Sequence, residues 1–195
     1  MAVVFAGLVP FAAATCASPG PNNLMVAASG ANFGLRATVP HMLGVIFGLP
    51  VLILAAGVGL GALFGAYPLI HTILKVAGSA YLLYLAWRIA VADGSSLESR
   101  TRPFTFVQAV LFQWVNPQAW VLAVSSLSAY TRGAGGAGDA AVVGLVFAAC
   151  TVPTLTVWAL FGRAIAGRLR SRRARRIFNG AMAAVLAASL IPIVR

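Results

Sequence analysis

Charged residues are scarce in this sequence, and acidic residues are almost absent. The 195 residues include only three Asp or Glu against 14 Lys or Arg, and charged residues make up 9% of the chain. About a quarter of the residues in an ordinary soluble domain are charged. Because hydrophobic residues reach 61% and the mean hydropathy is +0.93, the composition excludes an ordinary soluble domain and indicates an integral membrane protein.

Cysteine and acidic residues, which commonly carry enzyme chemistry or bind metals, are few. The only two cysteines, Cys16 and Cys150, are too few for a disulfide framework or a zinc site. No phosphate-binding loop of the type G-x-x-x-x-G-K-[ST] occurs, which excludes ATP hydrolysis by that route. The acids Asp93, Glu98 and Asp139 all fall in predicted loops, so none is a proton relay inside a membrane helix. We therefore expect no enzyme, no cofactor and no metal.

Long uncharged stretches are abundant. A membrane-spanning helix needs about 20 mostly apolar residues, and the sequence predicts six spans, at residues 3–29, 39–64, 69–92, 104–130, 140–162 and 177–194. The fold class that follows is all-α: a polytopic membrane protein whose single integral membrane domain takes up residues 1–195. The first span lacks the basic segment that opens a cleavable signal peptide, so we expect it to be retained.

The basic residues are distributed unevenly between the two sides of these spans. Seven arginines fall between the fifth and sixth spans, and eleven of the 14 basic residues would lie on the same side. By the positive-inside rule, these Arg-rich loops are cytoplasmic, which places both termini outside. The net charge of +11 is then a topological signal and a contact for anionic lipid rather than a nucleic-acid site.

Prolines interrupt two of the predicted spans near their middle. The first span carries Ser18, Pro19, Gly20, Pro21, Asn22 and Asn23, and the fourth carries Asn116, Pro117 and Gln118. Proline has no N–H and clashes with the preceding helical turn. A backbone group freed in hydrocarbon needs a partner in the protein or in a water-filled cavity. Since broken helices mark the binding sites of many transporters, we predict that these nine residues form a substrate-binding and translocation site.

The two halves of the sequence resemble each other at an offset of about 100 residues. Gly44-Val45-Ile46-Phe47 corresponds to Gly144-Leu145-Val146-Phe147, Gly78-Ser79-Ala80 to Gly180-Ala181-Met182, and the region around Pro19 to that around Pro117. Because each half has three spans, the second half enters the membrane from the opposite side. The sequence thus predicts two inverted three-helix repeats, at 1–95 and 103–195, with alternating access at a midplane site.

The amide side chains beside the interruptions suit a small zwitterion. These are Asn22, Asn23, Asn116 and Gln118. Each amide has both a donor and an acceptor, and the ends of interrupted helices offer partly positive N–H groups and partly negative C=O groups. The other interpretation, given equal weight for each residue, is that the amides only satisfy backbone groups that the prolines free.

Four residues elsewhere are candidates for a translocation path or a hinge. Pro50 and Pro153 would kink the second and fifth spans, Thr154 would line a path, and His41 is the ionisable residue near the start of the second span. Thr in a membrane helix often bonds to its own backbone, and a lone His at a helix end is more often interfacial. A structural role therefore stays open for Thr154 and His41.

Several motifs occur in a fixed order along the chain. They are Ser18-Pro19-Gly20-Pro21-Asn22, Gly34-x-Arg36, His41-x-x-Gly44, Gly78-x-x-Tyr81-Leu82 and Asn116-Pro117-x-Ala119-Trp120. Together they resemble the LysE/RhtB-type amino-acid exporters over essentially the whole chain, although Gln118 stands where that family commonly has lysine. The resemblance implies efflux of amino acids or close derivatives across the bacterial inner membrane, driven by the proton gradient. Because no acid lies in a span to neutralise a second positive charge, a neutral amino acid is the preferred substrate.

Two other functions stay open from the sequence. Cys16, just before the first interruption, raises a membrane thiol–disulfide electron carrier, although its partner is expected at the second interruption and Cys150 is on the fifth span. Gly57, Gly61 and Gly65 repeat every four residues and let helices approach closely, which would also suit a passive small-solute pore. The expected partners are an amino acid and the lipid bilayer, with a homo-oligomer left open.

Overall fold

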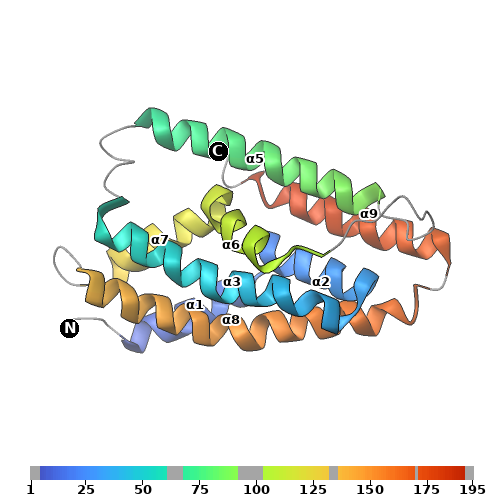
Figure 1. The fold of residues 1–195 in the computed structure, drawn as a ribbon, viewed down its shortest axis with the longest axis horizontal. Coiled ribbons are helices and arrows are strands. Elements are labelled where there is room, and N and C mark those ends of the chain that lie inside the picture. The colour runs from blue at the N-terminus through green and yellow to red at the C-terminus, as the bar shows by residue number, and fades with distance from the viewer. Residues whose placement is uncertain (1–4, 61–67, 92–102, 132–135, 170, 192–195) are drawn as a thin grey trace.

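The computed structural model describes residues 5–60, 68–91, 103–131, 136–169 and 171–191. The regular structure in these ranges is entirely helical, which confirms the all-α class for the described residues. The elements are α1 (Phe5–Ala17), α2 (Pro21–Phe33), α3 (Leu35–Ala55), the π-helical turn η1 (Ala56–Leu60), α5 (Pro68–Val91), α6 (Phe106–Val115), α7 (Pro117–Tyr130), α8 (Ala137–Ala166) and α9 (Arg172–Ala188). In Figure 1 the long helices run along the molecule's long axis, with α5 and α9 side by side.

These helices follow the six predicted segments with shifted boundaries. The first predicted span contains α1 and most of α2, and the fourth contains α6 and α7. Within the described residues, two helical stretches are long and apolar enough to cross a membrane by themselves, Leu35–Gly59 and Ala137–Ala166. The count of six spans, the single domain and the inverted repeat therefore stay predictions.

The last helix begins earlier than the predicted span at 177–194. The structure places Arg172, Arg173, Arg175 and Arg176 in the first turns of α9 rather than in a connection between helices. Positive charge is unfavourable there because a helix N-terminus is itself partly positive. Ser171 offsets this by capping the helix, since its hydroxyl accepts a hydrogen bond from the N–H of Ala174 at 3.0 Å.

Gly34 is the single residue that joins α2 to α3. Its φ of +80° lies in the region that glycine adopts without steric cost. Its N–H donates to the carbonyl of Gly30 at 3.1 Å, which ends α2. This short joint lets α2 and α3 pack against each other and carries the chain directly from the first interrupted segment into the longest apolar run of the first half.

Helix α8 packs along α2, α3 and α1. Its contact with α2 depends on glycines, because small residues let two helix backbones approach closely. A Cβ atom added at Gly30 would lie 2.5 Å from the carbonyl oxygen of Ala159, and one added at Gly162 would meet the carbonyl oxygen of Ala27. At these two glycines the backbones of α2 and α8 are in close contact, with no room for a larger side chain.

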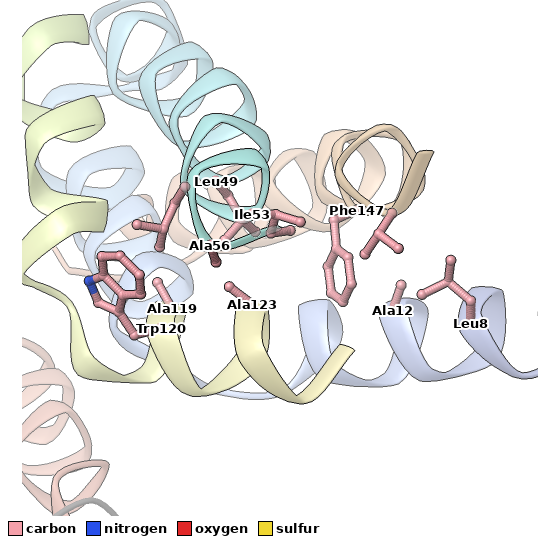
Figure 2. Close-up of a cluster of buried hydrophobic side chains, with 11 residues drawn as sticks. Leu8, Ala12, Leu49, Ile53, Ala56, Ala119, Trp120, Ala123 and Phe147 are labelled. Carbon is pink, nitrogen blue, oxygen red and sulfur yellow. The ribbon is translucent and has the colours of Figure 1, made fainter. Parts of the chain in front are cut away.

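A buried apolar cluster joins α1, α3, α7 and α8. Figure 2 shows Phe147 of α8 with Leu8 and Ala12 on one side and Ile53 of α3 on the other. A second cluster joins α2, α5, α6 and α9. The two clusters hold the helices that carry the interruptions in fixed positions.

Large apolar side chains also cover the outer faces of the helices. Phe47 is 57% exposed, Val157 63% and Leu145 68%. Soluble monomers rarely expose extensive apolar surface, whereas helices that face lipid do so along their whole length. This surface agrees with the membrane class that the composition indicates.

The glycines of the predicted repeat have unequal surroundings. A Cβ atom at Gly78 of α5 would meet the carbonyl oxygen of Val115 and lie 3.1 Å from Cδ of Pro117, next to the second interruption. Its counterpart Gly180 of α9 has no heavy atom of the described residues within 4 Å of that position. The correspondence between the halves therefore does not extend to these contacts.

Alanine at Gly162 should weaken the α2–α8 packing, because the added methyl group would overlap the carbonyl of Ala27. Overpacking of this kind costs about 1–3 kcal/mol, measured as the free energy of unfolding in detergent. Gly180→Ala is the matched control, and it should stabilise the protein by about 0.5–1 kcal/mol because it adds helix propensity in open space. Equal destabilisation by both substitutions would contradict the packing described.

Candidate functional site

The chain leaves helical geometry at both proline motifs. Helix α1 ends at Ala17 and α2 begins at Pro21, while α6 ends at Val115 and α7 begins at Pro117. Gly20 and Asn116, which precede prolines, are extended, with φ/ψ of −123°/175° and −83°/107°. The proline ring disfavours a helical conformation of the residue before it, so the sequence itself dictates where each helix stops.

Side chains bind the carbonyl groups that are freed at the first interruption. Asn23 donates through Nδ2 to the carbonyl oxygens of Cys16 and Ser18, at 2.6 and 2.7 Å. The hydroxyl of Ser18 donates to the carbonyl of Thr15 at 2.7 Å. Asn23 is buried, and both of its amide hydrogens are used in this way. Its role is therefore to satisfy the interrupted backbone.

The second interruption is satisfied in a similar manner. The side chain of Asn116 caps α7 by accepting a hydrogen bond from the N–H of Gln118 at 3.1 Å. The indole Nε1 of Trp120 donates to the carbonyl of Trp114 at 2.8 Å. Trp120 is not among the residues predicted from the sequence for the site. It supports the interruption by binding a carbonyl that α6 leaves free.

A reciprocal pair of amides joins the two halves of the chain. Asn22 donates through Nδ2 to Oε1 of Gln113 at 2.9 Å, and Gln113 donates through Nε2 to Oδ1 of Asn22 at 3.1 Å. Gln113 is fully buried and also donates to the carbonyl of Ala109 at 2.9 Å. The sequence prediction omits Gln113. Its signal was an amide side chain within an apolar segment, three residues before Asn116.

A cavity lies between the two interruptions, and we call it the central cavity. Polar residues of both interruptions and of α8 line it, namely Thr15, Cys16, Ser18, Gly20, Asn22, Asn23, Asn116, Gln118, Thr151 and Thr154. The space open to the centre of a water molecule is about 60 Å³. Since one water needs roughly 10–15 Å³ by this measure, the cavity has room for a few waters or a small solute. None of the described residues that line it is charged.

Gly20 and Gln118 bring the two interruptions into contact. A Cβ atom added at Gly20 would lie 2.7 Å from Oε1 and 3.1 Å from Nε2 of Gln118. The amide of Gln118 therefore lies directly against the bare backbone of Gly20. Any larger residue at position 20 would displace this amide from the wall of the central cavity.

The polar groups of the central cavity differ in what they can still bind. Among the described residues no side chain caps α2 at Gly20, so the first N–H groups of α2 remain a partly positive end. The hydroxyls of Thr151 and Thr154 donate to the carbonyls of Phe147 and Cys150, at 2.7 and 2.9 Å. One lone pair of Thr151 faces the thiol of Cys16 at 3.5 Å, and the other lone pairs of the two hydroxyls remain as acceptors. The cavity thus offers donors at α2 and acceptors on α8.

Some predicted site residues lie away from the central cavity. Pro19, Pro21 and Pro117 form the interruptions without lining it. Pro50 packs against Gly144 of α8, with its Cα 3.3 Å from a Cβ atom built there. Pro50 and Pro153 both lie inside continuous helices, and Pro153 is exposed. His41 is buried and lines a different cavity.

Cys16 and Cys150 are free thiols. The Sγ atom of Cys16 lies 3.5 Å from the hydroxyl of Thr151 and lines the central cavity. Cys150 belongs to α8, so the second interruption contains no cysteine. The predicted glycines Gly61 and Gly65 and both chain termini lie outside the described residues.

Comparison with known proteins gives one family and a group of relatives. The family described as LysE type translocator matches residues 13–191. Cysteine/O-acetylserine efflux proteins of Escherichia coli O1:K1 and Salmonella typhimurium are 31% and 30% identical to this chain over 117 residues. The matched part spans 60% of this chain and 60% of the length of each relative. No solved structure is a significant match.

Leucine at Asn22 should destabilise the protein, because the fully buried amide of Gln113 loses its partner. Leucine at Gln113 should cost less through this contact, because the partly buried Asn22 still lines the central cavity. An unsatisfied buried group costs about 1–3 kcal/mol, measured by unfolding in detergent. The double variant Asn22→Leu/Gln113→Leu should lose less stability than the two single variants together. Strictly additive losses would show that the two amides are not coupled.

Proposed function

The chain belongs to the LysE-type translocator family, and we propose that it exports small neutral amino acids or their close derivatives from the cytoplasm. A member of this family is a membrane transporter and not an enzyme. The efflux relatives are named for cysteine and O-acetylserine, both of which are amino acids with uncharged side chains. We extend that substrate class to this chain.

The observation that carries the proposal is the central cavity itself. Residues that are about 100 positions apart, such as Asn22 and Gln118, line one small cavity at the point where two apolar segments are interrupted. Interrupted helices that meet in this way supply binding groups without placing charged side chains in the membrane. If these polar side chains only satisfied the interrupted backbone, no cavity with unused donors and acceptors would be needed.

A zwitterion fits the distribution of these groups. The carboxylate would bind the partly positive start of α2, where backbone N–H groups favour an anion. The ammonium group would donate to the hydroxyl oxygens of Thr151 and Thr154. Because the described lining holds no charged side chain, nothing would balance a second positive charge, which favours a neutral over a cationic amino acid.

The packing of the helices supports alternating access between inverted repeats. The second helix of each half packs on the interrupted segment of the other half, α3 on α6 and α8 on α1, while α3 contacts α8 and α5 contacts α9. Rocking of one set of helices against the other would open the central cavity to one side at a time. We place the Arg-rich end of the molecule in the cytoplasm, with the protein in the inner membrane and both termini outside.

Family membership also favours transport over the thiol–disulfide alternative. A relay between the interruptions would need a cysteine in each, and Asn116, Pro117 and Gln118 provide none. A passive pore would need a continuous opening, whereas the described central cavity is small and lies among packed helices.

Export can be measured in cells and in proteoliposomes. Cells that overproduce the protein should release O-acetylserine, cysteine or another neutral amino acid faster than cells with an empty vector. Purified protein in liposomes should move the same compound. If a broad screen of amino acids finds no flux in either system, the proposed function is wrong.

Filling the central cavity should block export. Thr154→Trp places an indole in the cavity and should weaken substrate binding there. Transport at low substrate concentration should fall at least tenfold, which corresponds to a loss of about 1.4 kcal/mol in binding free energy. Thr156→Trp is the matched control. Both hydroxyls bond to the carbonyl four residues earlier, but Thr156 is exposed. Equal transport by the two variants, at equal amounts in the membrane, would contradict the assignment of the cavity.

A further inference from the structure

A second cavity lies at the other end of α2, between α2, α3 and α5. We call it the outer cavity because it lies farther from the middle of the molecule than the central cavity; the name does not refer to a side of the membrane. Its polar lining comes from Ser29 and Asn32 of α2, His41 of α3 and Arg88 of α5. The rest of the lining is apolar and includes Phe104 and Leu85. About 80 Å³ is open to the centre of a water molecule, which is slightly more than in the central cavity.

His41 has no hydrogen-bond partner in the part of the chain that the structure describes. Its side chain is 1% exposed, and neither Nδ1 nor Nε2 is bonded. The ring packs against Phe104, with the centroids 5.3 Å apart, so its contacts there are apolar. Buried polar side chains are nearly always paired. The unpaired imidazole in the wall of this cavity is therefore a group that a polar solute could bind.

Arg88 is the cationic group of this cavity. Its guanidinium lies over the ring of Tyr84, 5.9 Å from the centroid, and the described residues offer it no ion pair. Among the acids, Asp139 is in the first turn of α8, at the opposite end of the molecule from the end of α5 (Figure 1). Asp93 and Glu98 lie outside the described residues.

We propose that the outer cavity binds the carboxylate of an amino acid before it reaches the central cavity. The planar guanidinium of Arg88 matches a carboxylate through two parallel hydrogen bonds. A ring N–H of His41 can donate a further hydrogen bond, whereas Asn32 already donates to Ala28 and Asn179. The apolar wall accommodates the remainder of a small solute. The identification of the ligand as the exported amino acid rests on the proposed function, whereas the carboxylate chemistry does not.

Residues on one face of α2 line both cavities. Asn22 lines the central cavity, and Met25, Ser29 and Asn32 line the outer one. Their spacing of three and four residues places all of them on the same side of the helix. Asn22 and Ser29 are seven positions apart, a rise of about 10 Å. The outer cavity lies toward the Arg-rich end, which we assign to the cytoplasm, so an exported solute meets it first.

Thiol labelling tests the carboxylate site without any assumption about transport. Asn32→Cys would be placed in a Cys16→Ser/Cys150→Ser background and treated with methanethiosulfonate reagents of opposite charge. The anionic ethylsulfonate reagent should react faster than the cationic trimethylammonium reagent, and millimolar acetate should slow the reaction. Adding Arg88→Gln should abolish both the preference and the protection.

Arg163→Gln is the matched control for general attraction by the Arg-rich end, because Arg163 is exposed in the last turn of α8 and does not line the outer cavity. That variant should keep both the preference and the protection by acetate. The proposal is overturned if Arg88→Gln behaves like Arg163→Gln. It is overturned as well if neither reagent reaches position 32, because a carboxylate site must admit a small anion.

Export kinetics test whether the site serves transport. Arg88→Gln in the otherwise unchanged chain should raise the KM on the cytoplasmic side about tenfold, as expected for losing a charge-assisted bidentate contact, with a smaller effect on the maximal rate. Arg163→Gln should leave the KM unchanged. Acetate protection without any export by the unsubstituted protein would refute the proposed function and leave the carboxylate site standing. Export with equal KM values for both variants would remove the outer cavity from the path.

Discussion

Backbone groups freed inside a membrane protein cannot form hydrogen bonds to bulk water. The rest of this structure depends on that constraint. Each proline motif removes a helical hydrogen bond and forces the preceding residue, Gly20 or Asn116, into an extended conformation. Asn23, Ser18 and Trp120 then bind the freed carbonyls. What remains unused is the donor end of α2. Gly20, Asn22 and Asn23 at this end line the central cavity, which makes it chemically suited to an anion such as a carboxylate.

The all-helical class and the two interruptions could be read from the sequence, because apolar length and proline position determine where helices start and stop. The six spans and the inverted repeat stay predictions. Two features of the described helices could not be read from the sequence. The arginines at 172–176 were expected between helices, because positive charge is unfavourable at a helix N-terminus. Instead they form the first turns of α9, where the side chain of Ser171 caps the helix. The close approach at Gly162 depends on which helix face meets α2, which hydrophobic patterning in an all-apolar helix does not specify.

The candidate site was predicted in outline and differs in its division of roles. All four predicted amides line the central cavity. Asn23 and Asn116 also bind the backbone of their own interruptions, and Asn22 pairs with Gln113. Gln113 was missed because its partner Asn22 is 91 residues away and no local pattern reveals such a pair. The outer cavity was likewise hidden, since His41 and Arg88 belong to different helices.

The central claim is that a transported amino acid binds between the two interruptions. It is tested most directly by an experimental structure of the protein in a lipid nanodisc with the exported compound bound. The account predicts ligand density in contact with the start of α2 and with Thr151 or Gln118. Ligand density found only elsewhere, with an empty and unchanged central cavity, would contradict it.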